Sequence, residues 1–585
     1  MAMEVEAEEA SLALFEAGVV DRDSSSNRTI VPISTPTTTT NPATPTSNAG
    51  SNIHQSSPST TKIYLNPAEL FLIRDGYQLQ WATKPAPWKI KKMQHSPSDQ
   101  QAVDAAIDKF LKAGIIYRSP TQDRSYLSNF FTIQEPTKRR PILDCTRLNQ
   151  HLQVQHFKME GIPALRDLVE PDDYIVKVDL KDAYVVVPIH PSSQKFLSLE
   201  NRGIVYQYSS LAFGLSLAPR IFTKLMRYAV EPLRAQGIRL IYYLDDICIL
   251  EKSKSKLKET VQLVLQHLQD LGFLINHGKS VLTPNKIQEF LDFKIDTRKM
   301  EISLPQHKLS KLMQRLKQVE KDPERSCRWI AGLLGKITAV IPAVQEALLH
   351  IRHIQRDLAR SLQTNHHQWD RVCKLTKKSM LEISWWKSHL NVKNGLPIHP
   401  QPLSKDALTV HVDALDSGWG VHSTRVSQAG FWDDKAKEDS INVRELKAIY
   451  YALILHAREG DIKELRLHTD NITALKYVTK AGGTASSVLQ DLAVKIQDLC
   501  NQYSMKVHYQ HIAGVKNTVA DHLSRIHKPL HESSIPPRFF SQLRQSWGRR
   551  WKIDAFAASH NHKLPQYWSM TKDPFSSRMD AFQQS

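Results

Sequence analysis

Cysteine is scarce in this sequence, and long runs of apolar residues are missing. The 585 residues include five cysteines, and no two of them form a C-x-x-C pair. Their number and spacing exclude a disulfide-stapled scaffold and a zinc knuckle, and they favour a reducing compartment. No apolar run approaches the roughly 20 residues of a membrane helix, and the N-terminus is too acidic for a signal or transit peptide. We expect a soluble intracellular protein, cytoplasmic or nuclear, without a membrane partner.

Basic residues outnumber acidic ones, with 77 lysines and arginines against 59 aspartates and glutamates. The net charge of +18 makes a polyanion such as nucleic acid the first partner to consider. The first 30 residues run against this trend, with seven acids and two arginines, and a tract rich in Ser, Thr and Pro follows them. Such a composition cannot bury enough apolar area to fold, so residues 1–62 are predicted to be disordered.

The stretch IYYLDDICIL, residues 241–250, is apolar on both sides of Asp245 and Asp246. This pattern predicts two buried strands joined by a tight turn. Two adjacent acids between core strands are costly to bury unless a cation sits on them, and Mg²⁺ prefers carboxylate oxygens. Taken alone, the pattern fits an ordinary hairpin with a polar turn equally well.

A third acid, Asp179, ends the apolar strand pattern of residues 174–180. An acid that caps the following helix would explain Asp179 by itself. Adjacent strands of one sheet would instead bring it beside Asp245 and Asp246. Phosphoryl transfer by two metal ions needs such a group of strand-borne carboxylates.

A second group of acids follows between residues 405 and 526. Asp413 and Asp470 end alternating strand patterns, Glu445 opens a helical pattern, and Asp521 closes the series. Four acids at strand ends and helix starts, drawn from separate parts of a β-then-α segment, again suggest a site for two metal ions.

Six motifs occur in order between about residues 100 and 300: KRRPILDCTRLN, VDLKDAY, LAFGLSLAP, YLDD, GFLINHGKS and EFLDF. Their order resembles the fingers, palm and primer-grip motifs of a reverse transcriptase. The resemblance implies that Asp179, Asp245 and Asp246 hold two Mg²⁺ ions, with Mn²⁺ as a substitute. We expect the substrates to be an RNA template, a DNA primer and dNTPs.

The same resemblance assigns residues to the nucleotide site. Arg140 would contact the incoming triphosphate, although a basic turn is more often only a solvated hairpin tip. Tyr184 would be the steric gate, because its ring fills the space that a ribose 2′-OH needs. Phe213 would floor the nucleotide pocket, and Lys279 could protonate the leaving pyrophosphate.

The second group of acids resembles that of a ribonuclease H domain, on the motifs DALDSGWG and HTDN and on the spacing from His511 to Asp521. The resemblance implies that the four acids hold two Mg²⁺ ions and that His511 helps product release. The substrate would be an RNA–DNA hybrid. The tail after this segment resembles that of DIRS-like retrotransposons, which implies a tyrosine recombinase encoded by the same element as a partner.

Three short motifs suggest other functions and are rejected. GKS at residues 278–280 lacks a glycine at the P-loop spacing and follows a helix. DSG at residues 416–418 matches an aspartic protease triplet, but no second protease signature follows it. His353 and Arg356 match the H-x-x-R of tyrosine recombinases without a nucleophilic tyrosine, and a helix surface pair explains them better.

We therefore predict a mixed α/β (α+β) multidomain fold, a right-hand polymerase followed by a helical connection and a ribonuclease H-like domain. The expected boundaries are 1–62 disordered, 63–98 an N-terminal extension, 99–299 fingers and palm, 300–404 thumb and connection, 405–526 ribonuclease H-like, and 527–585 a DIRS-like tail.

The leading hypothesis is a retrotransposon polymerase that copies RNA, then DNA, into DNA and degrades the RNA of the hybrid. One alternative is a domesticated, catalytically inactive scaffold that binds nucleic acid, which predicts lost carboxylates in at least one site. Another is an RNA-templated RNA polymerase, which would need neither Tyr184 nor a ribonuclease H domain.

Overall fold

The computed structural model describes residues 74–88, 90–91, 93–134, 139–525, 535–547, 551–555, 557–569 and 573–577. The described residues fall into two compact units, which divide between Glu301 and Ile302. We call them the N-terminal and the C-terminal unit. The segment predicted to be disordered, residues 1–62, and Lys138 of the basic turn lie outside the described residues. Within the described ranges, no helix is long and apolar enough to cross a membrane.

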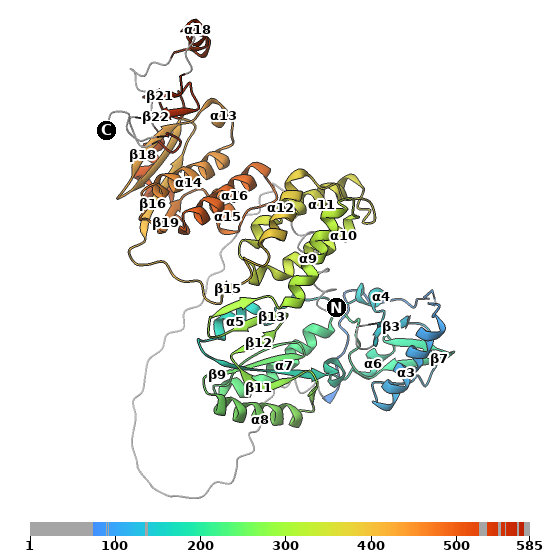
Figure 1. The fold of residues 1–585 in the computed structure, drawn as a ribbon. Helices are drawn as coiled ribbons and strands as arrows, with labels where there is room; N and C mark the ends of the chain where they lie inside the picture. The colour runs from blue at the N-terminus through green and yellow to red at the C-terminus, as the bar shows by residue number, and fades with distance from the viewer. Residues whose placement is uncertain are drawn as a thin grey trace, which may run out of the picture. The chain divides into compact units, whose positions relative to one another are not determined.

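The predicted mixed, multidomain fold class is confirmed, since both units combine helices with sheets (Figure 1). The described helices of the N-terminal unit are α3 (Pro97–Lys112), α4 (Thr146–Asn149), α5 (Ile162–Leu168), η1 (Ala183–Val186), α6 (Pro191–Gln194), α7 (Ala218–Ala235) and α8 (Lys254–Asp270). Its outer strands are β1 (Ile116–Arg118), β2 (Leu127–Ser128), β3 (Phe130–Gln134), β4 (Arg139–Leu143), β6 (Ser198–Asn201), β7 (Ile204–Tyr208), β12 (Ile287–Phe290) and β13 (Phe293–Asp296).

The central sheet of the N-terminal unit is antiparallel and contains the YLDD stretch. Its order is β10-β5-β9-β8, with β11 also paired to β5, and its strands are β5 (Tyr174–Lys181), β8 (Arg239–Tyr243), β9 (Asp246–Glu251), β10 (Leu274–Ile275) and β11 (Val281–Asn285). The predicted pair of strands joined by a tight turn is confirmed, because β8 and β9 pair in register and Leu244 turns with φ 51°.

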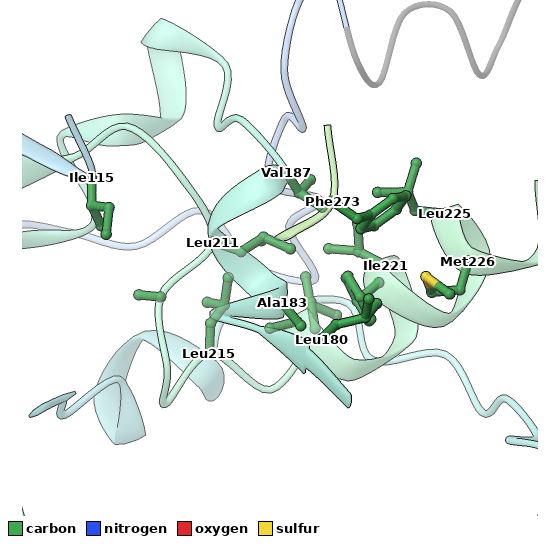
Figure 2. Close-up of a cluster of buried hydrophobic side chains, with 14 of the residues drawn as sticks. Ile115, Leu180, Ala183, Val187, Leu211, Leu215, Ile221, Leu225, Met226 and Phe273 are labelled. Atoms are coloured by element: carbon green, nitrogen blue, oxygen red, sulfur yellow. The ribbon is translucent and has the colours of Figure 1, made fainter. Parts of the chain in front are cut away.

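A buried apolar cluster supports the end of β5 that carries Asp179. Leu180 and Ala183 lie among Ile221 and Leu225 of α7 and Phe273 before β10 (Figure 2). The apolar residues of α7 recur on one helical face, as expected for a helix that covers a sheet. This packing holds the backbone around Asp179 in place.

The C-terminal unit begins with a helical region formed by α9 (Gln306–Lys321), α10 (Cys327–Val340), α11 (Arg352–Thr364) and α12 (Lys377–His389). A five-stranded sheet follows in the order β18-β17-β16-β19-β20. Its strands are β16 (Leu408–Ala414), β17 (Gly418–Ser423), β18 (Ser427–Phe431), β19 (Glu464–Thr469) and β20 (Lys506–His511). The neighbours β16, β19 and β20 run parallel, whereas β17 and β18 are antiparallel to their partners.

Helices cover this sheet and continue into a small tail. They are α14 (Ile441–Ala457), α15 (Ile472–Thr479), α16 (Ser487–Gln502) and α17 (Thr518–Ser524), and the tail holds α18 (Pro537–Trp547), β21 (Ile553–Ala555) and β22 (Gln566–Trp568). Gly420 of β17 allows α17 to approach closely, because a Cβ there would lie 2.3 Å from the Ala520 carbonyl oxygen.

Polar contacts join the helical region to the sheet region within the C-terminal unit. Gln490 Nε2 donates to the carbonyl oxygen of Leu349 at 2.7 Å, and both residues are buried. His353 contacts Asp491 through Nε2 at 3.1 Å, and Arg356 donates to a backbone carbonyl after α15. The prediction of a helix surface pair at His353 and Arg356 is therefore wrong for His353, which is buried and joins two parts of the unit.

A buried ion pair fastens the far end of the central sheet in the N-terminal unit. The Asp173 carboxylate, which is fully buried, accepts two hydrogen bonds from Arg239, at 2.6 and 2.8 Å. Burial alone would raise the pKa of Asp173, but the bonds from Arg239 outweigh it and hold the pKa below the usual value. The ionised carboxylate therefore stabilises the fold above about pH 4, and this contribution is lost as pH falls through the lowered pKa.

We expect Asp173→Asn to destabilise the N-terminal unit by about 3 kcal/mol at neutral pH, because it leaves Arg239 without its buried partner. Urea unfolding of the full chain at pH 7.5 and pH 3.5 measures the change. The difference between variant and wild type should shrink at the lower pH. A difference that stays the same at both values would contradict a role for the charge.

Candidate active sites

The first group of acids gathers at one end of the β5–β9 pair. Asp179 of β5 stands directly opposite Asp246 of β9 in the register. Opposed residues of an antiparallel pair share a face, so these two side chains project on the same side of the sheet. Asp245 lies in the turn before β9, and its carbonyl oxygen accepts the Leu180 N–H at 2.8 Å. Two segments distant in sequence thus bring all three acids to one place.

Burial and mutual repulsion act on these acids together. Burial raises the pKa of Asp179 and of Asp245, and the neighbouring carboxylates raise both pKa values further. Lysines compensate in part: Lys279 Nζ lies 3.8 Å from Asp179 Oδ2, and Lys177 Nζ lies 2.8 Å from Asp246 Oδ1. Carboxylates that are buried against each other provide the hard oxygen donors that a divalent cation such as Mg²⁺ prefers.

Sequence reasoning missed the neutral hydrogen-bond partners that orient Asp179. Asn276 Nδ2 donates to Asp179 Oδ1 at 2.7 Å, and the Asp179 N–H donates to Ser280 Oγ at 3.0 Å. Ser280 in turn donates to the Asn276 carbonyl oxygen at 2.9 Å. Asn276 and Ser280 both belong to the GFLINHGKS motif, so the motif signalled them, although its GKS end looked like part of a P-loop.

The three residues predicted for the nucleotide site lie together. Arg140 of β4 sits 5.5 Å from the centre of the Phe213 ring, and the ring of Tyr184, on η1, is centred 5.0 Å from that of Phe213. Gly214 makes this arrangement possible, because its φ is +111° and a Cβ there would lie 2.0 Å from the Leu143 carbonyl oxygen. The loop that carries Phe213 is therefore pressed directly against the end of the strand that carries Arg140.

Asn149, which sequence reasoning also missed, clamps this loop. Its Nδ2 donates to the Gly214 carbonyl oxygen at 3.0 Å, and its Oδ1 accepts the Ser216 N–H at 2.9 Å. Its position in the motif KRRPILDCTRLN gave no hint of a contact with a segment more than 60 residues away in sequence.

The second group of acids forms a tight cluster. Asp413 at the end of β16, Glu445 of α14 and Asp470 after β19 each offer a ligand atom within 4.8 Å of the others, which no other group of three among the described residues does. The parallel pairing of β16 with β19 brings Asp413 and Asp470 to the same edge of the sheet. By the same criterion, the ligand atoms of Asp179, Asp245 and Asp246 do not all lie within 4.8 Å of one another.

The electrostatics of the second cluster favour a cation. Burial raises the pKa of Asp413 to about 6, and burial with repulsion from Asp413 and Asp470 raises the pKa of Glu445 to about 9. Glu445 Oε2 is buried without a hydrogen-bond partner in the described part of the chain. A buried carboxylate oxygen that lacks a partner, beside two further carboxylates, fits the ligand set of a divalent cation.

Asp521 and His511, the other two residues predicted for the second site, lie beside the cluster of three acids and are not part of it. Asp521 of α17 forms two hydrogen bonds with Arg525, at 2.7 and 2.9 Å, and Arg525 lowers the pKa of Asp521. His511 is exposed at the end of β20. Ser524, missed by sequence reasoning, donates to Asp413 Oδ2 at 2.6 Å. Asp416 of the DSG triplet is exposed and pairs with Arg444, which agrees with the rejection of a protease.

Residues 132–295 match the family model described as reverse transcriptase (RNA-dependent DNA polymerase), and the matched range includes all seven residues predicted for the first site. The chain is 24% identical over 455 residues to the enzymatic polyprotein of Figwort mosaic virus, with coverage of 75% of this chain and 63% of that polyprotein. It is 22% identical over 470 residues to the transposon Tf2-3 polyprotein of Schizosaccharomyces pombe, with coverage of 78% and 32%.

The chain thus spans less than two thirds of the length of these relatives. Among solved structures, it aligns with a foamy viral protease-reverse transcriptase in complex with an RNA/DNA hybrid, at a TM-score of 0.48 and 15% identity, covering 78% of this chain and 59% of that one. Residues 132–295 are thus similar to reverse transcriptases, and the chain as a whole is similar to a viral polyprotein and to transposon polyproteins.

Binding of a cation to the second cluster predicts a shift in thermal stability. Mg²⁺ should raise the melting temperature of the wild type, because it binds the folded state alone. Glu445→Gln should raise the melting temperature without metal by roughly 2–4 °C, since it removes a buried carboxyl that resists ionisation. The same variant should lose most of the Mg²⁺ response of the C-terminal unit. Differential scanning calorimetry with and without Mg²⁺ measures both effects, and Glu464→Gln, outside the cluster, is the control.

Proposed function

We propose that this chain, whose residues 132–295 match the reverse transcriptase family model, is the RNA-directed and DNA-directed DNA polymerase of a retrotransposon and also cleaves RNA in RNA–DNA hybrids. The family match over residues 132–295 supports the first activity, because it includes the three acids that gather at one end of the β5–β9 pair. The cluster of Asp413, Glu445 and Asp470 supports the second. The net charge of +18 suits a template, a primer and a hybrid as partners.

In the proposed polymerase site, Asp179, Asp245 and Asp246 would hold two Mg²⁺ ions, or Mn²⁺ in their place. Bound there, such ions stabilise charge on the attacking and leaving oxygens of phosphoryl transfer. The residues of this chain position the substrates: Arg140 orients the triphosphate of a dNTP, and Phe213 supports the nucleotide from below. Lys279, whose Nζ lies 3.8 Å from Asp179, gives a proton to the leaving pyrophosphate as the primer 3′-OH attacks.

In the proposed ribonuclease H site, Asp413, Glu445, Asp470 and Asp521 would hold two further Mg²⁺ ions. The reaction is hydrolysis of an RNA phosphodiester by water, which the carboxylates align against the hybrid. Asp521 must first give up its contacts with Arg525 to act as a ligand. His511 is exposed at the rim and is free to assist release of the cleaved strand.

The proposed domains follow the boundaries predicted from the sequence: fingers and palm at 99–299, thumb and connection at 300–404, ribonuclease H at 405–526 and a DIRS-like tail at 527–585. A DIRS-like element would also encode a tyrosine recombinase, which makes such an enzyme the proposed partner. Both suggestions rest on the amino-acid sequence of the tail and on the motifs LAFGL and IAGVKNTVADHLSR.

A second candidate function is an inactive scaffold that binds nucleic acid. The observation that favours it is the ion pair between Lys177 and Asp246, since a lysine there competes with a metal for one of the three carboxylates. This candidate predicts that the purified chain binds a primer–template but incorporates no nucleotide.

The two proposed activities should be separable by single substitutions. Asp245→Asn should abolish Mg²⁺-dependent extension of a primer on an RNA template but leave hybrid cleavage unchanged. Asp470→Asn should do the reverse, because it removes a ligand from the other cluster. A primer-extension assay with a labelled RNA template reads product length and template decay together. Continued synthesis by Asp245→Asn, or continued RNA decay by Asp470→Asn, would refute the corresponding site.

Tyr184 should exclude ribonucleotides by the volume of its ring. Tyr184→Ala should increase incorporation of rNTPs relative to dNTPs by roughly tenfold or more, because the space for a 2′-OH opens. Tyr184→Phe keeps the ring and should retain the wild-type selectivity. Single-nucleotide incorporation with matched rNTP and dNTP pairs measures the ratio, and equal ratios in all three proteins would remove the gate role.

A further inference from the structure

Three histidines stand in a row across the sheet of the C-terminal unit. His411 of β16 lies opposite His422 of β17 in one register and opposite His468 of β19 in the other. Side chains opposed in this way lie on the same face of a sheet, with Cβ atoms roughly 5 Å apart. The rings of His411 and His468 are in contact, with centres 5.0 Å apart and planes inclined by 43°.

His468, at one end of this row, has buried ring nitrogens that no described protein group satisfies. Nδ1 and Nε2 of His468 are both buried, and neither has a hydrogen-bond partner among the described residues. At the other end of the row, His422 Nδ1 makes a long contact of 3.4 Å with Ser427 Oγ. Buried polar atoms without a partner are rare and call for a bound water or ion. Paired imidazoles with unused lone pairs are ligands for a metal.

The row lies next to the acid cluster on the same two strands. His411 precedes Asp413 by two residues, and His468 precedes Asp470 by two residues. Side chains repeat on one face every two residues, so each histidine stands roughly 7 Å along its strand from the acid. The negative potential of the cluster attracts cations to this part of the sheet. The ligand type differs, because imidazole suits Zn²⁺ and Cu²⁺ whereas carboxylates suit Mg²⁺.

We propose that His411 and His468 form a second metal site that binds a transition-metal ion such as Zn²⁺. This site is separate from the Mg²⁺ ligands of Asp413, Glu445 and Asp470. Two cations on neighbouring positions repel each other, so Zn²⁺ on the histidines weakens Mg²⁺ binding at the acids. The expected consequence is inhibition of hybrid cleavage by Zn²⁺, and this consequence alone rests on the proposed ribonuclease H activity.

Binding is tested on the full chain, with the acid cluster disabled by Asp413→Asn and Asp470→Asn. Zn²⁺ is titrated against a chromogenic chelator, and Co²⁺ serves as a spectroscopic probe of the ligands. We expect the background variant to keep about one Zn²⁺ per chain, with visible Co²⁺ absorption of nitrogen ligation. Adding His411→Gln and His468→Gln should abolish both signals. Loss of Zn²⁺ in the background variant, or no change after the histidine substitutions, would overturn the proposal.

A matched control uses the other adjacent pair of histidines. His366 and His367 are exposed and follow α11, far from the row in sequence, so His366→Gln with His367→Gln should leave Zn²⁺ binding unchanged. Melting curves show whether each variant is folded.

The last measurement is cleavage of a labelled RNA–DNA hybrid in the presence of Mg²⁺. Added Zn²⁺ should inhibit the wild type and spare the His411→Gln/His468→Gln variant. Inhibition that is equal in both proteins would overturn the inhibitory role. A chain that binds Zn²⁺ through the histidines but cleaves nothing refutes the proposed ribonuclease H activity and leaves the metal site intact.

Discussion

Repulsion between carboxylates that are removed from water is the constraint on which the rest of this protein depends. The fold brings acids together at strand ends in both units, where burial makes each negative charge costly. Glu445 shows the extent of this cost, since its pKa rises to about 9 beside Asp413 and Asp470. Carboxylates that the fold holds together at such a cost are suited to be the ligands of a cation. Binding of a cation at these strand ends would offset the repulsion between the carboxylates and so stabilise the folded state.

The two groups of acids meet this constraint with the same kinds of support. In each, a small polar side chain fixes one acid: Asn276 binds Asp179 in the first, and Ser524 binds Asp413 in the second. In each group, a basic residue also forms an ion pair with one acid at the edge of the group, as Arg525 does with Asp521. The neutral donors set orientation, and the basic residues reduce repulsion. The strand directions differ, because antiparallel strands bring the first group together and parallel strands bring the second group together.

Local patterns in the sequence were sufficient for the elements but not for the details of the sites. Alternating apolar residues around Asp245 predicted the hairpin, and the same rule placed Asp179 on a buried strand that proved to be its neighbour. The contacts of Asn276 and Ser524 could not be predicted, because each reaches an acid about 100 residues away through the tertiary fold. Asp521 was expected among the ligands because it closes the series of acids and resembles an acid of ribonuclease H domains, and neither signal shows that Arg525, one helical turn away, would bind it.

The contacts between the helical region and the sheet region of the C-terminal unit have a consequence for how this chain can be divided. A boundary near residue 404 follows the change from helices to strands, but Gln490 and Asp491 beyond it take partners at Leu349 and His353 before it. An excised sheet region would expose the amide and carboxylate of α16 without those partners. A segment of this chain can therefore resemble a known domain and still be unable to fold by itself. The smallest self-sufficient piece around the second acid cluster therefore begins upstream of α11.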